Sequence, residues 1–356
     1  MCPHPPKGGD FYCILGVMKT ILSIVLSVFI CYVFFTVLIK STHFDGEKAH
    51  FEYKAQGMDQ LADTLVAKKI IFDKPSFLLL AKVFKVENKV KPGRYLVKRK
   101  TSLLDLIRML RNNQQATVKF ILNKVRTRAE LAALVGKTFD LDSAYCASYF
   151  NNNDSLLPYQ TDTTQLLTLF IPDTYEFYWS TPIPKFLQKM KSNADRFWSL
   201  KDRKQKAANK TMSLNEIYTL ASIVEEETNF DSDKRLIASV YQNRLKKSMP
   251  LQACPTIKFA MQDFGLTRIY EKYLSNPSPY NTYNHRGLPP GPICTPSPKT
   301  IDLVLDAPTT DYLYFVAKAD FSGYHHFSSS YEEHNQYAKE YQKQLDIYQQ
   351  KKSANK

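Results

Sequence analysis

The stretch that organises this sequence is Asn215–Phe230, NEIYTLASIVEEETNF, an apolar pattern that ends in three glutamates. Apolar residues return every three or four positions, which predicts an α-helix with one face packed against a core. The apolar stripe consists of Ile217, Leu220, Ile223 and Val224. Glu227 continues the stripe, whereas Glu225 and Glu226 fall beside it, toward the polar face. The three carboxyl groups are therefore expected to differ in their surroundings.

Glu227 is the glutamate that this geometry selects for chemistry. A carboxyl group directed at an apolar wall has its charged form desolvated, so its pKa should rise. A raised pKa is what a general acid needs near neutral pH. The alternative is a helix that simply ends in acidic, solvent-facing residues. The helix dipole disfavours negative charge at a C-terminal end, so a purely structural role for the cluster is harder to explain.

A second informative stretch, residues 278–296, is dense in proline and glycine. It has the sequence SPYNTYNHRGLPPGPICTP, and neither a regular helix nor a central strand tolerates that composition. We expect an extended, rigid loop with fixed turns. Its tyrosines and asparagines suit a carbohydrate cleft, because a ring stacks on a sugar face while hydroxyl and amide groups bond the sugar hydroxyls. A proline-stiffened connector with buried tyrosines is the other interpretation.

Several segments, taken together, resemble one protein family. They are LASIVEEET (220–228), ASVYQNRLKKSMPLQACPT (238–256), SPYNTYNHRGLPPGPI (278–293) and YLYFVAKADFSGYHHFSSSYEEHNQY (312–337). In order and spacing they are similar to the membrane-anchored endolytic murein transglycosylases (MltG/YceG-like). The resemblance is dense over residues 214–342 and thinner over 50–213, where KPGRYLVK (91–98) and IPDTYEFY (171–178) also look like family segments.

The resemblance implies a peptidoglycan lytic transglycosylase, a lyase that cuts the MurNAc–GlcNAc bond inside glycan strands. Its products would carry 1,6-anhydroMurNAc ends, and its action would limit or terminate strand elongation. By the same resemblance Glu227 is the single catalytic acid/base, with Glu225 as a secondary candidate. The implied substrate-binding residues are Gln252, Thr256, Tyr280, Asn281 and Tyr283. Where the family usually has Asp-Pro-Thr, this chain has Cys254 before Pro and Thr, which puts any carboxylate role there in doubt.

Two other functions stay open. A hydrolytic muramidase would need a partner acid, and Asp231 and Asp233 are the nearest in sequence. A non-catalytic, membrane-anchored scaffold that binds peptidoglycan and recruits wall-synthesis enzymes would keep the stripe and the proline-rich loop. It would not need an acid at Glu227.

The N-terminal part contains an uninterrupted apolar run without charged residues, Thr20–Ile39. Its length fits a span of a lipid bilayer, and Lys7 and Lys19 before it favour a cytoplasmic N-terminus. A cleaved signal peptide would end in small residues, and no such site follows this run. We therefore expect a retained single-pass helix in the cytoplasmic (inner) membrane, with the catalytic domain on the extracytoplasmic side.

The 356-residue chain has 44% hydrophobic and 13% aromatic residues, as a globular protein does, and a formal net charge of +14. The positive excess suits anionic partners. We expect peptidoglycan glycan strands and the membrane, with peptidoglycan synthases as further partners and no nucleic acid. The six cysteines show no metal-ligand spacing, so neither a metal nor another cofactor is expected. Cys254 and Cys294 are either free or paired with each other.

The expected fold class is α+β. Residues 1–19 would form a cytoplasmic tail, 20–39 a transmembrane helix, 40–116 a linker with a small LysM-like α/β module, and 117–352 a mixed α+β catalytic domain. Residues 41–54 are expected to be a polar connector. Helices are predicted at 58–67 and 76–84, a strand at 91–97, and a helix at 101–110 that begins with a Thr-Ser cap. The LysM-like interpretation comes from the family resemblance, and such a module would either bind GlcNAc-containing glycans or act as a spacer.

Overall fold

The computed structural model describes residues 16–28, 31, 42, 44–266 and 269–354. The chain divides into two compact units. The first runs to Val118 and includes Tyr178–Ser180, and the second comprises Lys119–Phe177 and the chain from Thr181 onward. Helices and short antiparallel strands occur in both, which confirms the expected α+β class.

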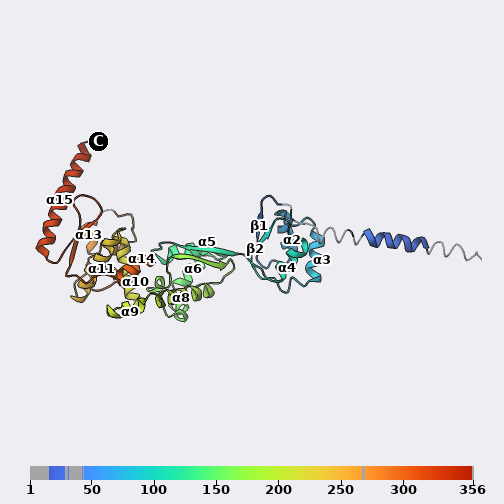
Figure 1. Ribbon diagram of the computed structural model, residues 1–356, viewed down its shortest axis with the longest axis horizontal. Helices are drawn as coiled ribbons and strands as arrows, with labels where there is room; N and C mark the ends of the chain where they lie inside the picture. The colour runs from blue at the N-terminus through green and yellow to red at the C-terminus, as the bar shows by residue number, and fades with distance from the viewer. Residues whose placement is uncertain (1–15, 29–30, 32–41, 43, 267–268, 355–356) are drawn as a thin grey trace, which may run out of the picture. The chain divides into compact units, whose positions relative to one another are not determined.

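The first unit is a small α/β module in which helices pack around a two-stranded sheet (Figure 1). Its elements are β1 (Lys48–Tyr53), α2 (Met58–Ala67), α3 (Lys74–Val83), β2 (Gly93–Lys98) and α4 (Leu103–Arg111). The side chains of Asp73 and Ser102 cap α3 and α4 by accepting hydrogen bonds from backbone N–H groups of the first turn. The core of the unit contains Leu61, Leu65, Phe77, Leu106 and Leu110, which are inaccessible to solvent.

The prediction of a polar connector over residues 41–54 was wrong, because most of its second half forms strand β1. This strand pairs antiparallel with β2, and Phe51 lies opposite Tyr95 with ring centroids 5.5 Å apart. Phe51 and Tyr53 are both buried. Only these two aromatic residues alternate with polar ones in this stretch, which is rich in charged residues. Such a short alternation does not indicate a strand. The cross-strand partner supplies the missing stabilisation.

The expected apolar span, Thr20–Ile39, lies partly outside the described residues, which omit 29–30 and 32–39. Residues 16–28 are helical. Within the part of the chain that the structure describes, no helix has both the length and the apolar character needed to cross a membrane.

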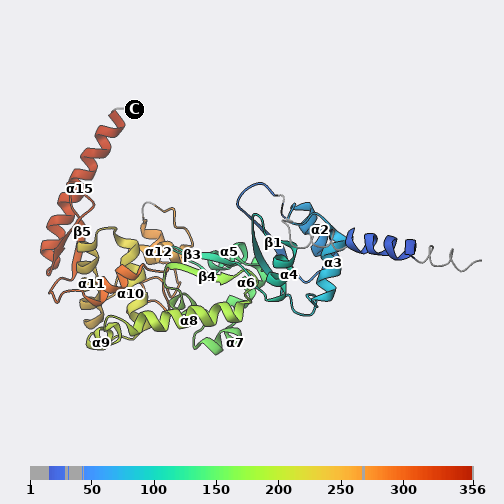
Figure 2. The same cartoon turned by 45° about the vertical axis from the view of Figure 1, so that its right-hand side comes forward.

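The second unit is mostly helical, with two pairs of short strands. Figure 2 shows β3 (Thr117–Leu122) beside β4 (Asp173–Tyr178), and β5 (Tyr314–Ala317) pairs antiparallel with β6 (His325–Ser328). The helices before the site are α5 (Arg128–Thr138), α6 (Ser143–Phe150), α7 (Asn153–Leu156), α8 (Ile183–Ser199) and α9 (Arg203–Asn209). The later helices are α10 (Leu214–Glu227), α11 (Asp231–Lys246), α12 (Cys254–Met261), α13 (Glu271–Leu274), α14 (Pro298–Leu305) and α15 (Tyr331–Ala354).

Helix α10 is the central element of the second unit, in contact with α9, α11, α12 and α14. It begins with a capping box in which Ser213 and Glu216 bond each other's backbone N–H groups. Every residue from Ile217 to Val224 is buried. The predicted polar face is therefore absent in the middle of the helix. A helix that is buried all round must have its polar side chains satisfied by the protein. The Tyr218 hydroxyl accordingly donates to the Phe170 carbonyl, 2.6 Å away.

Candidate active site

Glu227 is the last residue of α10, at the point where this buried helix reaches a partly accessible surface. Its Oε1 accepts a hydrogen bond from the hydroxyl of Tyr241, 2.6 Å away. Tyr241 lies on α11 and is almost completely buried. One oxygen of the carboxyl group is thus fixed by a side chain from the neighbouring helix.

Burial raises the pKa of the Glu227 carboxyl to about 7, and the nearby charge of Glu226 acts in the same direction. The Tyr241 hydrogen bond and the positive charge of Lys258 oppose this rise without cancelling it. At neutral pH the group therefore exists in both protonated and ionised forms. A carboxyl group in this state can donate a proton in one step and accept one in the next.

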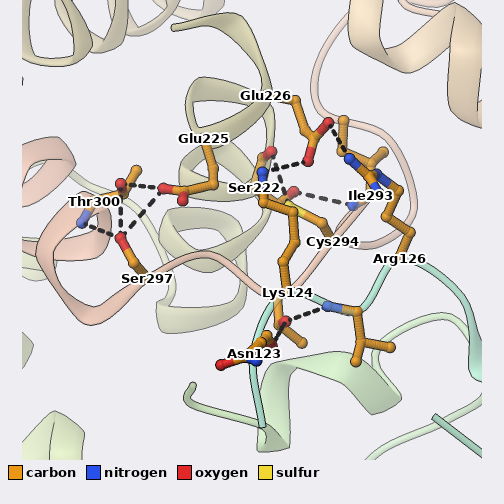
Figure 3. A network of polar contacts seen from close by, with 12 residues as sticks. Asn123, Lys124, Arg126, Ser222, Glu225, Glu226, Ile293, Cys294, Ser297 and Thr300 are labelled. Atoms are coloured by element: carbon orange, nitrogen blue, oxygen red, sulfur yellow. Dashed lines mark hydrogen bonds and ion pairs between the residues drawn. The ribbon is translucent and has the colours of Figure 1, made fainter. Parts of the chain in front are cut away.

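Glu225 is held by a separate polar network that includes Ser297 and Thr300 (Figure 3). Its Oε2 lies 2.9 Å from the Nζ atom of Lys234, a side chain with 9% exposure. The hydroxyls of Ser297 and Thr300 donate to the same oxygen. Because Lys234 also donates to Thr300, the four side chains form a closed cluster that joins α10, α11 and the start of α14.

Glu226 forms the third, independent arrangement (Figure 3). Its two oxygens lie 2.9 Å from Lys124 Nζ and 3.1 Å from Arg126 Nη2. Burial would raise the pKa of Glu226, but the hydrogen bonds and charges of Lys124 and Arg126 outweigh it and hold the pKa below its usual value. The expectation that Glu225 and Glu226 lie toward a polar face was wrong, because both are paired within the protein.

Three of the predicted substrate-binding residues lie at or near the protein surface. Gln252 is exposed, and its Oε1 accepts a hydrogen bond from Arg244 at 3.3 Å. Tyr283 is partly buried, with its hydroxyl 3.2 Å from the Cys254 sulfur atom, and the charge of Glu227 contributes to a raised tyrosine pKa that is due mainly to burial. Tyr280 is also partly buried and packs against Phe259, with ring centroids 4.6 Å apart.

The other two, Thr256 and Asn281, are inaccessible to solvent. The hydroxyl of Thr256 donates to the Ala253 carbonyl and lies 2.8 Å from the Thr282 hydroxyl. The amide nitrogen of Asn281 donates to the carbonyls of Leu274 and Asn276. These contacts favour a role in shaping the loop over direct contact with a substrate.

The end of the proline-rich loop is bonded to α10 and to the segment after β3. The backbone N–H of Ile293 donates to Ser222 Oγ at 3.0 Å, within α10 (Figure 3). The N–H of Thr295 donates to the Val125 carbonyl at 2.8 Å, and the N–H of Val125 donates back to Thr295 Oγ1 at 2.9 Å. Three distant parts of the sequence therefore meet at the glutamate cluster.

Cys254 and Cys294 are both free thiols, the first exposed and the second buried. Among the residues that the structure describes, no group of three His, Cys, Asp or Glu side chains is placed to hold a metal ion. His325 instead pairs with Asp233, with Nδ1 and Oδ2 2.9 Å apart.

Comparison with known proteins now identifies the family. The model of the YceG-like family matches residues 53–340. The chain belongs to the YceG-like family. Its first unit from Tyr53 onward and nearly all of its second unit therefore lie within the family region.

Named relatives agree with this assignment. The chain is 42% identical over 130 residues to the endolytic murein transglycosylase of Bacillus subtilis (strain 168), a match that covers 36% of this chain and 35% of the relative. It is 34% identical over 168 residues to the enzyme of that name from Streptococcus pneumoniae R6, covering 46% of this chain and 30% of the relative. The aligned part thus spans about a third of each relative.

A solved structure extends the comparison to most of the fold. A crystal structure of a YceG-like protein from Listeria monocytogenes matches with a TM-score of 0.54 and 26% sequence identity. The match covers 82% of this chain and 98% of the Listeria chain.

The residues around Glu227 in this YceG-like chain include several that sequence reasoning did not select. Tyr241 had a usable signal, because it follows Ile237 by four positions and so lies on the same face of its helix. Lys124 and Arg126 had none, because they lie in a short basic stretch that looks like ordinary surface sequence, and Lys258 is a single lysine among apolar residues.

One cavity of the second unit lies away from Glu227. It has a volume of about 760 Å³ and is lined by Glu216, Lys210 and Leu288 among others, toward the N-terminal end of α10. A helix of 14 residues is about 20 Å long, so this cavity and Glu227 belong to opposite ends of α10.

The raised pKa of Glu227 predicts a pH dependence of stability. The pKa is about 7 in the folded state against an ordinary value of 4.5, so the folded state binds the proton more tightly. The contribution of this proton to the free energy of unfolding is complete below the pKa of the unfolded state. It is lost as the pH rises through the pKa of the folded state. Between about pH 5 and about pH 8 the free energy of unfolding of the unmodified chain should therefore decrease. The decrease should be smaller in the Glu227→Gln variant, by about 1–3 kcal/mol. Urea unfolding at both pH values measures the difference, and identical pH dependence of the two proteins would contradict it.

Proposed function

We propose that this chain is an endolytic lytic transglycosylase that cleaves the MurNAc–GlcNAc bond inside peptidoglycan strands and leaves 1,6-anhydroMurNAc ends. The observation that carries the proposal is the state of Glu227, which has a pKa of about 7 beside two glutamates already committed to ion pairs. The names of the curated relatives support the same activity.

One carboxyl group is enough for this reaction because the nucleophile belongs to the substrate. Protonated Glu227 donates its proton to the glycosidic oxygen, and the bond from that oxygen to the MurNAc C1 breaks as an oxocarbenium-like centre forms. The resulting carboxylate takes the proton of the MurNAc C6 hydroxyl, whose oxygen closes on C1. The proton balance is restored, and neither water nor a cofactor is consumed. Tyr241 would hold the carboxyl group in one orientation through both steps.

The hydrolytic alternative is less well supported. It requires a second carboxylate that activates water or attacks the sugar. Asp231 is paired with Lys299, and Asp233 is buried and bonded to both the backbone and the ring of His325. Glu225 is likewise held by Lys234. Each nearby acid therefore has another partner.

The decisive experiment is product analysis by mass spectrometry after incubation of the chain with purified peptidoglycan. We expect chains that end in 1,6-anhydroMurNAc. Reducing ends, which are heavier by one water, would indicate a muramidase, and the absence of new ends would favour the scaffold.

The first unit is proposed to be a LysM-like glycan-binding module. Its compact α/β fold, with its own core and a two-stranded sheet, is compatible with this role. Deletion of residues 50–115 should weaken co-sedimentation with insoluble peptidoglycan several-fold while leaving cleavage of short glycans partly intact. Unchanged co-sedimentation would leave the module as a spacer.

We also propose that residues 20–39 anchor the chain in the cytoplasmic membrane, with the second unit outside and close to peptidoglycan synthases. The uncharged apolar sequence and the preceding lysines support this proposal. In cell fractionation the chain should be found in the membrane pellet. Protease added from outside should remove the residues after about 40. Recovery of a soluble mature chain that begins near residue 41 would contradict it.

A further inference from the structure

The second unit contains another cavity, lined in part by Arg126, and the proposed reaction does not use it. It has a volume of about 370 Å³, within the range of small-ligand sites. The residues that line it include Arg126, Arg128, Phe259, Tyr280 and Asn151. No acidic residue lines this cavity in the described part of the chain.

A smaller cavity shares lining residues with this one and borders the glutamate cluster. It has a volume of about 40 Å³, and Arg126 and Phe259 line both cavities. Its other walls include Glu226, the neighbour of the proposed acid, and Lys258, whose charge acts on Glu227. A ligand group in the 370 Å³ cavity would therefore lie next to Arg126, which pairs with Glu226.

Both arginines in the cavity have unused capacity to bind an anion. Arg126 forms an ion pair with Glu226 through Nη2, but its buried Nε has no hydrogen-bond partner among the described residues. Such an orphaned buried donor needs an explanation, and a bound acceptor supplies one.

Arg128 is held by neutral acceptors. Its Nε and Nη1 donate to Asn151 Oδ1 at 2.7 Å and to the Thr163 carbonyl at 2.6 Å. It forms no ion pair within the described residues. Asp162 is close enough to sense its charge, but its Oδ1 is occupied by Thr164 and Gln165. A guanidinium group fixed in this way presents its remaining N–H donors in the geometry that a carboxylate accepts.

We propose that this cavity binds a carboxylate of the peptide substituent carried by the sugar next to the cleaved bond. The inference rests on the proposed function, because it takes a peptide-bearing glycan as the ligand. Arg128 and Arg126 supply the positive charge, and the Tyr280 and Phe259 rings supply an apolar wall for the adjoining part of the sugar or peptide. The enzyme would then distinguish strands that carry peptides from strands that have lost them.

The test measures binding in the full chain with Glu227→Gln, which prevents turnover. The two ligands are purified soluble glycan strands with peptides and the same strands after an amidase has removed the peptides. Addition of Arg128→Gln should raise the Kd for peptide-bearing strands about tenfold or more, as expected for a lost hydrogen bond to a charged group. The Kd for peptide-free strands should change less than about twofold. Arg196→Gln, which removes the same charge from an exposed position on α8, is the matched control.

Arg128→Lys serves as the second variant, because it keeps the charge and much of the side-chain volume. It should show an intermediate loss for peptide-bearing strands, and thermal unfolding checks that both variants are folded. Equal changes for the two ligands, or no change for either, would overturn the inference. If the unmodified chain is active but binds both ligands equally, the proposed role of the cavity is refuted and the proposed function stands. If the chain distinguishes the two ligands but forms no 1,6-anhydro product, the proposed function is refuted and the role of the cavity stands. If it binds neither ligand, both proposals are refuted.

Discussion

Glu227→Gln is expected to lower the rate at which 1,6-anhydroMurNAc ends are released by about 10²–10⁴-fold or more. The substitution keeps the shape of the side chain and an oxygen for the Tyr241 hydroxyl, but it removes the transferable proton. Loss of one general acid has this cost, and here the same group also serves as the base of the second step. Mass spectrometry of products from purified peptidoglycan gives the rate.

Glu340→Gln on the exposed face of α15 is the matched control and should retain full activity. Glu226→Gln is not a suitable control, because Glu226 pairs with Lys124 and Arg126. If folded Glu227→Gln retained normal activity while Glu225→Gln lost it, the acid would have been assigned to the wrong residue. If neither change mattered, the enzyme proposal would fail.

Glu225→Gln is expected to have its largest effect on stability. The carboxylate neutralises Lys234, a buried ammonium group that has no other ion-pair partner in the described structure. Removal of one member of a buried ion pair leaves the other charge desolvated and costs about 3–5 kcal/mol. Urea unfolding at neutral pH measures the change in the free energy of unfolding.

The double variant Glu225→Leu with Lys234→Met separates this cause from a general packing defect. Because it removes both charges, it should recover much of the stability lost in the single variant. Lys206→Met is the control for a surface pair, since Lys206 and Asp306 are 2.7 Å apart but well exposed, and it should cost about 0–1 kcal/mol. A fully destabilised double variant would show that packing, and not an unpaired charge, causes the loss.

The local pattern predicted α10 and the helices of the first unit with end points close to those observed. It also singled out Glu227, because a position on the apolar stripe is a matter of short-range geometry. The complete burial of α10 was not accessible in this way. Tyr218 and Ser222 look like polar-face residues until their partners are known, and those partners, Phe170 and Ile293, lie far away in the sequence.

The same limit applies to the other glutamates and to strand β1. Nothing in the sequence near Glu226 indicates that Lys124 and Arg126 neutralise it, since about a hundred residues separate them. Strand β1 depends on pairing with β2, which the residues of β1 alone do not encode strongly. Periodicity thus predicted which side chain faces the apolar core, while the ion pairs that separate the three glutamates required the three-dimensional fold.

The reciprocal hydrogen bonds between Val125 and Thr295 have a consequence for the order in which the molecule is built. They join positions that are 170 residues apart in the sequence. The contacts that hold the site together are therefore of high contact order. During synthesis the N-terminal unit and the segment after β3 leave the ribosome long before Thr295 does. Domains fold as units in the order of their appearance. The site around Glu227 is therefore expected to form late, after the chain has passed residue 295, so that an incomplete nascent chain carries its module but not its catalytic geometry.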